Sequence, residues 1–442
     1  MIAKTPCAIP RDWAKVRLKF LLDRIEQGWS PQSDNVPAEG DEWGVLKAGC
    51  VNGAHFNPLE NKRLPTTESP LPELEIRPGD VLMSRANTTE LLGSAAFVHE
   101  TRPRLLLCDK LYRLRVKQPV LFPEFLVWFL ASAAARSQLE PEATGASNSM
   151  QNIGQDSVGN LCVALPPPHQ QRVIADYLGR EARRLDALVA EKERLVALLA
   201  EKRRALITRA VTRGLDPAVP LRDSGHAWIG HVPEHWRTER MKFHLNRIEQ
   251  GWSPQCDSFP ADDDEWAVLK VGAVNEWQFD ASENKRLPPG IEPLLEYQIR
   301  PGDVLMSRAN TRELLGSAVL VHEVSRRLLL CDKLYRLVLG GGKLVADFLV
   351  CFLRSAPGRY EFERDATGAS NSMQNIGQDS VRNAWVPVPP LDEQHAIVAW
   401  IERETGKLDA LRAAAERTTG LLRERRAALI AAAVTGQLAV GS

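Results

Sequence analysis

The sequence repeats itself. The sixteen residues ATGASNSMQNIGQDSV run from Ala143 to Val158 and return unchanged from Ala366 to Val381, at an offset of 223 residues. At this offset, 17–160 and 240–383 share 95 of 144 positions without an insertion, and 166–213 and 389–436 share 23 of 48. Such a repeat is one structural unit written twice, so any fold for this chain must contain the same unit two times.

Composition favours an ordinary globular protein. The 442 residues are enough for two to four domains, and 44% hydrophobic and 25% charged residues fit that class. The longest apolar stretch, around 125–135, is too short for a membrane helix, and the N-terminus lacks the apolar core of a secretory signal. Seven cysteines without a C-x-x-C spacing suggest reduced thiols. We therefore expect a cytoplasmic protein with no membrane partner.

Charge limits how the chain can bind nucleic acid. The whole chain has a net charge of zero, and the segments 17–160 and 240–383 carry −3 and −2. Only 169–213 is clearly basic, at +5. DNA binding would therefore depend on local patches or on the charge of a partner.

Each repeat divides into a globular part and a helical part. Aliphatic runs between Gly, Pro and Asn predict strands at EWGVLKAGCV, DVLMS, SAAFVHE, LLLCDKLYRLRV and NLCVALPPP. FPEFLVWFLASAAA predicts one helix that begins at Pro123. The repeated sixteen residues have no hydrophobic period and predict a loop. The globular parts are thus expected to be mixed α/β.

The segments after Pro168 and after 390 predict long helices, because apolar residues recur there at spacings of three and four. These residues are Ile174, Leu178, Leu185, Leu188, Leu195, Leu199 and Leu206, then Ile397, Ile401, Leu408, Leu411, Leu422 and Leu429. A long helix with one apolar stripe needs a partner, and the other copy supplies it. We expect two similar α/β heads joined by two antiparallel coiled-coil helices with a pseudo-two-fold repeat. Duplex DNA, whose strands share such symmetry, would suit two heads of this kind.

The expected domain division follows these segments. It is 1–165 for the first head, 166–213 for the first long helix, 214–239 for a linker, 240–388 for the second head, 389–436 for the second long helix and 437–442 for a tail.

Several motifs, taken in their order along the chain, resemble those of a specificity subunit of a type I restriction-modification system. The resemblance rests on SRANT-x-ELLGSA, GASNSMQNI, the runs PPPHQQ and PPLDEQ that end in Gln171 and Gln394, and SGHAWIGHVPEHW before the second head. It implies that each head is a target-recognition domain reading half of a split double-stranded DNA target. It implies that the helices dock two modification (methyltransferase) subunits, which bind S-adenosylmethionine, and that restriction subunits complete the nuclease. The chain itself would hold no catalytic centre, cofactor or metal.

The heads are more alike than the helices, which is the reverse of the usual pattern in that family. This difference predicts two heads that read the same or nearly the same half-site, and therefore an inverted target.

The polar loops supply the predicted DNA-binding residues. Arg can pair with guanine and Asn or Gln with adenine through two hydrogen bonds, while Ser, Thr and Lys suit phosphate. The residues are Ser84, Arg85, Asn87, Thr88, Ser147, Asn148, Gln151 and Asn152, their repeats Ser307, Arg308, Asn310, Thr311, Ser370, Asn371, Gln374 and Asn375, and Lys47 and Lys270. The alternative is that these side chains only hold turns together. For partner docking we single out Ile174, Leu185, Leu195, Ile397, Leu408 and Leu422.

Enzymatic alternatives have weaker support. Asp41, Glu60 and Lys62, repeated as Asp264, Glu283 and Lys285, have the residue types of a Mg²⁺-dependent nuclease that would cut a symmetric site unaided. NPLE at 57–60 faintly matches a methyltransferase motif, but the second copy has DASE there. His226, His231 and His235 lie in the linker, where surface histidines are favoured over a zinc site. A purely structural linker would not explain why the polar loops match better than the helices.

Overall fold

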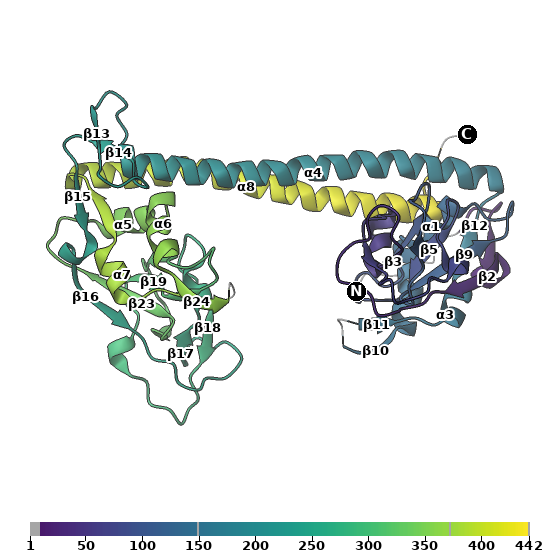
Figure 1. Cartoon of the computed structure of the whole chain (residues 1–442), viewed down its shortest axis with the longest axis horizontal. Helices are drawn as coiled ribbons and strands as arrows, with labels where there is room; N and C mark the ends of the chain where they lie inside the picture. Colours follow the sequence, from purple (N-terminus) through teal and green to yellow (C-terminus); the bar gives the residue numbers. More distant parts are fainter. Residues whose placement is uncertain (1–8, 148–149, 371–372, 441–442) are drawn as a thin grey trace. The chain divides into compact units, whose positions relative to one another are not determined.

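The computed structural model describes residues 9–147, 150–370 and 373–440. The chain forms two compact units (Figure 1). The first contains the described residues up to Glu193 together with those from Glu416 on, and the second runs from Arg194 to Ala415. Each unit therefore combines one head with part of both long helices. None of the described helices is long and apolar enough to cross a membrane.

The first head consists of short strands and three α-helices. Its strands are β1 Ala14–Arg17, β2 Leu22–Gln27, β3 Gly44–Leu46, β4 Asn61–Arg63, β5 Val81–Ser84, β6 Ala86–Asn87, β7 Ala95–Phe97, β8 Leu105–Leu106, β9 Leu111–Val116, β10 Thr144–Ser147, β11 Met150–Asn152 and β12 Cys162–Leu165, and its helices are α1 Pro123–Leu130, α2 Ala133–Leu139 and α3 Gln155–Gly159. The main sheet is antiparallel in the order β2-β9-β5-β7, and a smaller sheet has the order β4-β3-β8. The strand β3 pairs antiparallel with β4 and parallel with β8.

The main sheet separates two hydrophobic cores. On β5, Val81 and Met83 face a core that includes α1, α2 and the ends of the long helices, while Leu82 faces a core with β3 and β8. Because side chains alternate along a strand and both faces are covered, the continuous apolar run VLM fits a central strand.

The second head repeats this arrangement. Its strands are β15 Arg237–Arg240, β16 Leu245–Gln250, β17 Trp266–Leu269, β18 Asn284–Arg286, β19 Val304–Ser307, β20 Ala309–Asn310, β21 Ala318–Leu320, β22 Arg327–Leu329, β23 Leu334–Leu339, β24 Thr367–Ser370, β25 Met373–Asn375 and β26 Trp385–Val388, and its helices are α5 Ala346–Leu353, α6 Ala356–Asp365 and α7 Gln378–Asn383. The sheet orders β16-β23-β19-β21 and β18-β17-β22 match those of the first head strand for strand. The linker adds a hairpin of β13 Leu221–Asp223 and β14 His231–Pro233, where the sequence predicts only a loop.

The long helices are α4 Pro168–Arg213 and α8 Leu391–Val434. In the first unit, Ile174 near the start of α4 shares a core with Val434 at the end of α8. In the second unit, Val211 near the end of α4 shares a core with Ile397 near the start of α8. The helices are therefore antiparallel in each unit. The mixed α/β class and the long helices that the sequence predicts are confirmed.

A buried glutamine joins each long helix to its head. The side chain of Gln171 accepts a hydrogen bond from the Phe122 N–H (2.7 Å) and donates to the carbonyls of Val120 (3.0 Å) and Pro166 (2.9 Å). Gln394 makes the equivalent three bonds in the second unit. Both glutamines are fully buried, so each fixes the first turn of its helix against the head.

The prediction of a single helix from Pro123 is wrong, because the chain forms two helices there. The helix α1 ends at Leu130, and the Ser132 hydroxyl accepts a hydrogen bond from the Ala135 N–H as the N-cap of α2. Serine favours such caps, since its hydroxyl satisfies a backbone donor that the helix start leaves free.

Candidate nucleic-acid interface

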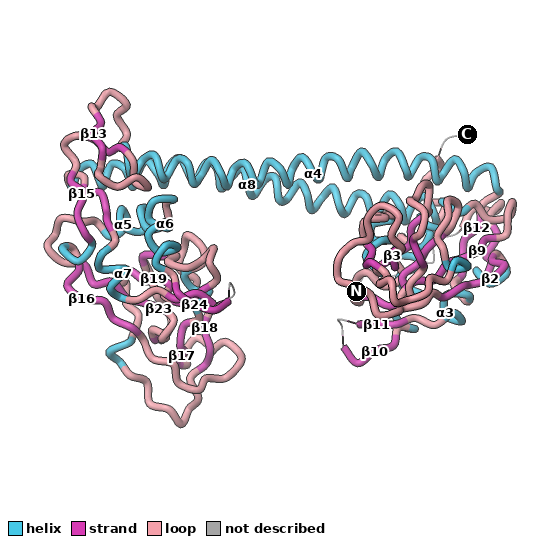
Figure 2. The backbone as a smooth tube through the Cα atoms, viewed as in Figure 1, coloured by secondary structure: helices cyan, strands magenta, loops and turns pink. Residues whose placement is uncertain are grey.

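The two polar segments of each head form one small sheet. The strands β10 and β11 pair antiparallel as a hairpin, and β11 also pairs with β6, which lies in the SRANT segment; strands are magenta in Figure 2. Gln151 lies opposite Asn87, and Asn152 opposite Ala86. The second head repeats this as β24, β25 and β20.

The predicted loop for the sixteen repeated residues is therefore wrong. They form a β-hairpin followed by a short helix. The strands are polar on both faces, so they lack the hydrophobic alternation by which a half-buried strand is recognised.

Backbone and side-chain hydrogen bonds fix this sheet to the head. The Tyr112 hydroxyl donates to the Ile153 carbonyl (3.0 Å), and the Ile153 N–H donates to the Arg85 carbonyl (2.9 Å). The Arg85 N–H in turn donates to the Lys110 carbonyl (2.9 Å). In the second head, Tyr335, Ile376, Arg308 and Lys333 make the same three bonds. The repeated sequence thus gives the same anchored sheet twice.

A glycine allows the hairpin strands to approach closely. Gly145 has a φ of +158°, and a Cβ there would lie 2.4 Å from the Met150 carbonyl oxygen. Gly368 has a φ of +152°, and its Cβ would lie 2.6 Å from the Met373 carbonyl oxygen. Any other residue at these positions would clash with backbone.

The hairpin exposes amides and a methionine. Gln151 and Asn152 are half-buried, as are Gln374 and Asn375. Met150 is 43% exposed and Met373 42% exposed. These methionines were not among the residues predicted from the sequence, although an apolar side chain inside a polar segment was the available signal. Apolar side chains beside a groove of DNA can insert between base pairs, so the methionines join the candidate residues.

An arginine lies beside each hairpin. The Arg85 Nη1 donates to the Asp109 carbonyl (3.0 Å), and its guanidinium lies 5.8 Å from the centre of the Tyr112 ring. Arg308 repeats both contacts with Asp332 (3.1 Å) and Tyr335 (5.8 Å). These contacts hold the guanidinium in place, and a held guanidinium is suited to bidentate recognition.

Other predicted residues hold turns. Ser84 and Ser307 are fully buried, and their hydroxyls donate to the carbonyls of Leu91 and Leu314 at 2.9 Å. Asn87 accepts a hydrogen bond from the Thr88 N–H, and Asn310 accepts one from the Thr311 N–H, both at 2.9 Å. In this structure the two serines have no surface to offer DNA. Thr88 is exposed and Thr311 half-buried, so both remain candidates.

The hairpin tips lie partly outside the described residues. Asn148 and Asn371 fall there. Ser147 and Ser370 are described by their backbones, which pair with Met150 and Met373.

The predicted lysines lie next to carboxylates. The Lys47 ammonium is 3.8 Å from Glu60, and the Lys270 ammonium is 3.8 Å from Glu283. Exposed pairs of this kind contribute little to stability. The charge that each lysine offers to a phosphate is nevertheless partly balanced.

The described residues contain no group of three His, Cys, Asp or Glu side chains able to hold a metal ion. Asp41 pairs with Arg104 at 3.5 Å, and Glu60 pairs with Lys47. The NPLE segment is a turn, in which Asn57 accepts a hydrogen bond from the Leu59 N–H (3.0 Å). Asp280 holds the same turn in the second head, where hydrogen bonds from Ser282 lower the pKa of its carboxyl. His226 packs against Trp385, and His235 bonds to Glu393 at 2.7 Å.

The predicted docking residues fall into two groups. Ile174, Leu185, Ile397 and Leu408 are buried by the chain itself, so they stabilise the helices rather than offer a surface. Leu195 is 38% exposed, and Leu422 is half-buried. Leu188, Leu198 and Leu411 are also exposed, and they belong to the accessible apolar face of the helices.

These features define an internally duplicated scaffold in which each head carries the same anchored polar sheet. Its curated relatives include specificity subunits of type I restriction enzymes. The chain is 29% identical to the EcoEI specificity subunit of Escherichia coli type I restriction enzyme over 37% of this chain and 27% of that protein. It is 21% identical to the EcoKI specificity subunit of E. coli K12 over 73% of this chain and 67% of that protein. The chain thus spans about a quarter of the first relative and two thirds of the second. No protein-family model matches the chain.

Solved structures show the same fold. A chain from a structure of an assembled type I restriction-modification system covers 98% of this chain with a TM-score of 0.69 and 19% identity. The HsdS subunit from Thermoanaerobacter tengcongensis covers 98% with a TM-score of 0.50 and 19% identity. The resemblance to type I specificity subunits that the sequence predicts is therefore confirmed.

Proposed function

We propose that this chain is the DNA-specificity subunit of a type I restriction-modification complex. In this role each head reads one half of a bipartite DNA target, and the long helices dock two modification subunits that bind S-adenosylmethionine. Restriction subunits join the complex, and the chain itself catalyses no reaction. The domain division given above and a cytoplasmic location are part of this proposal.

One observation carries the proposal. The same polar sheet occurs on both heads, held by the same hydrogen bonds from Tyr112 and Tyr335. An Arg, a Gln and an Asn at each sheet supply the side chains that recognise base edges through pairs of hydrogen bonds. Because the residues of this sheet are identical in the two heads, we propose that the half-sites are the same or nearly so, and inverted.

The charge of the heads indicates how the chain should bind. The segments 17–160 and 240–383 carry −3 and −2, so the isolated chain has little electrostatic attraction to phosphates. The modification subunits would supply the missing positive charge.

The proposal can be tested by measuring the affinity of the chain for DNA with and without modification subunits. We expect weak binding by the chain alone and tight, site-specific binding once modification subunits are added. The same titration with plasmid and Mg²⁺ should give no cleavage by the chain alone. Site-specific cleavage by the purified chain would instead establish a nuclease, and site-specific tight binding without partners would contradict the role proposed for them.

A further inference from the structure

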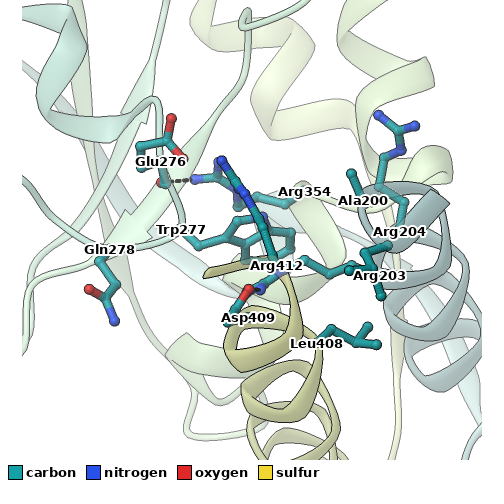
Figure 3. Close-up of a pocket in the computed structure, with 11 residues that line it drawn as sticks. Ala200, Arg203, Arg204, Glu276, Trp277, Gln278, Arg354, Leu408, Asp409 and Arg412 are labelled. Atoms are coloured by element: carbon teal, nitrogen blue, oxygen red, sulfur yellow. Dashed lines mark hydrogen bonds and ion pairs between the residues drawn. The ribbon is translucent and has the colours of Figure 1, made fainter. Parts of the chain in front are cut away.

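The second unit carries two adjacent hollows beside the long helices. One has a volume of about 500 Å³ and lies between α4, α8 and the loop of Trp277 (Figure 3). The other has a volume of about 790 Å³ and lies between α4 and α6. Arg204 and Arg354 line both, so the two hollows are neighbours, and we call them together the arginine groove.

The arginine groove has a positive charge that the first unit lacks. Seven arginines and four carboxylates line it, a net charge of +3. At the positions 223 residues away, the first unit has three arginines and three carboxylates, a net charge of 0. Arg204, Arg209, Arg354 and Arg412 correspond to Ala427, Ala432, Ala131 and Val189. The basic groove is therefore a property of one repeat alone.

Two of the arginines build the wall of the groove. Arg354 donates to the carbonyls of Asn275 (2.6 Å) and Ala318 (3.0 Å), and burial lowers its pKa to about 10. The Trp277 ring lies between Arg354, at 4.6 Å, and Arg203, at 4.8 Å (Figure 3). Trp277 and Arg354 correspond to two alanines, Ala54 and Ala131, so this wall is also absent from the first unit.

Two further arginines of the groove lie on the exposed surface of α4. Arg204 and Arg209 are exposed, and neither forms a hydrogen bond or an ion pair with any residue in the described parts of the chain. Like charges gathered along one groove repel each other, so an anionic ligand bound there would be stabilised.

Apolar surface accompanies this charge. Tyr360, which is 49% exposed, lines the second hollow, whereas Leu199, Leu408 and Ile229 are buried and contribute only to the floors of the two hollows. Further exposed leucines lie along the same helices in this unit, namely Leu195, Leu198 and Leu411. A DNA backbone offers charge but little apolar surface, and a duplex is too wide to enter a hollow of this size. A protein segment with acidic and apolar side chains matches both properties.

We propose that the arginine groove binds an acidic, amphipathic segment of a modification subunit. The inference rests on the proposed function and adds an asymmetry to it. One of the two docked subunits is held by charge as well as by apolar contact, whereas its counterpart on the first unit is held by apolar contact alone. The site on the second unit should therefore bind its modification subunit more tightly at low salt, and its affinity should fall more steeply as salt is added.

This proposal can be tested with substitutions that introduce the residues of the first repeat into the arginine groove. The variant Arg204→Ala with Arg209→Ala places in the groove the residues found at 427 and 432. Both side chains are exposed, so the fold should survive. Arg417→Ala with Arg425→Ala removes the same charge from exposed positions in the first unit and is the matched control. Arg204→Lys with Arg209→Lys retains the charge, and Ala427→Arg introduces an arginine at the equivalent position of the first unit.

Each variant is titrated as a full chain with purified modification subunit at low and at high salt, and native mass spectrometry counts the bound subunits. The wild type should bind two subunits with different salt dependence. The double alanine variant should weaken one site about ten- to a hundredfold at low salt, as expected for lost charge-assisted contacts, and leave the other unchanged. The lysine variant should retain most of the affinity, and Ala427→Arg should make the first site more salt-sensitive.

Three results would overturn the inference. Two sites with the same salt dependence, or an alanine variant that behaves like the control, would show that the groove holds no subunit. Loss of DNA affinity with unchanged subunit binding would assign the groove to DNA instead. A chain that binds no modification subunit at all would reject the proposed function itself, which distinguishes that failure from failure of the groove.

Discussion

At the residue scale, only some of the polar side chains in the repeated motifs are placed where they could contact DNA. Ser84 and Arg85 are neighbours in the same motif, but the serine is buried on its own turn while the arginine lies beside the hairpin. Gln151 and Asn152 are paired through their backbones with the segment that carries Arg85. The arginine and the two amides of each head therefore remain candidates for base recognition through hydrogen bonds, beside the methionine and the threonine of each head.

Removing the amides should affect one half-site at a time. Gln151→Ala with Asn152→Ala should weaken binding to one half of the target, and Gln374→Ala with Asn375→Ala should weaken binding to the other half. Each lost bidentate contact should cost about 1–3 kcal/mol of binding free energy. The measurement is affinity for DNA with either half scrambled, together with the melting temperature. Variants that melt earlier but keep full specificity would show that the amides only hold the hairpin together.

Gly145 offers a test of the hairpin backbone. In Gly145→Ala the new Cβ would meet the Met150 carbonyl, and a backbone held in this glycine-only region should cost about 1–3 kcal/mol. We expect a distorted hairpin and loss of one half-site, measured by the same binding assay. Gly154→Ala is the control, because a Cβ there has no atom within 4 Å. Equal behaviour of the two variants would mean that the hairpin does not contribute to recognition.

At the element scale, the sequence predicts individual helices and strands better than it predicts contacts between segments that are far apart in the chain. It predicts the helices α4 and α8 because their periodicity is local, and the strand β5 because its apolar run is continuous. The sheet of β10, β11 and β6 brings together segments far apart in the chain, and no period marks polar strands. The arginine groove could not be predicted from the sequence for a similar reason, since Trp277 and Arg354 lie on different elements and only the fold brings them together.

The main sheets of the two heads differ in one ion cluster. In the first head, Arg113 and Arg115 contact Asp80 at 3.6 and 2.6 Å and also contact Glu26. In the second, Val338 replaces Arg115, and Arg336 alone contacts Asp303 (3.2 Å). Burial would raise the pKa of Glu26, but its arginine partners lower it below 4.5. Burial raises the pKa of Asp303 above 3.8.

These opposite shifts predict that acid destabilises the first head more than the second. The lowered pKa of Glu26 stabilises the fold above pH 4.5, and this stability is lost as the pH falls through the folded-state pKa. The raised pKa of Asp303 has the opposite sign: its contribution is present below pH 3.8 and is lost as the pH rises through the folded-state pKa. Hydrogen exchange of peptides from β9 and β23, corrected for intrinsic rates, would measure the difference. Val338→Arg should reduce it, and equal protection of both heads on acidification would contradict this assignment.

At the scale of the whole molecule, the duplication is the central fact. Each compact unit contains one head and part of both long helices, and each head carries the same anchored sheet. The wall of Trp277 and Arg354 and the groove arginines Arg204 and Arg209 belong to one unit alone. We therefore expect the two heads to read the same DNA half-site and the two units to bind modification subunits with different affinities.

The most direct test of the account is the pattern of adenine methylation in cells that express this chain with its modification subunits. Methylome sequencing, with and without the chain, should show a target made of two inverted, closely similar half-sequences separated by unspecified base pairs. The methylation should disappear when the chain is absent. Two unrelated half-sequences would contradict equal reading by the two heads, and methylation that persists without the chain would contradict its role as the specificity subunit.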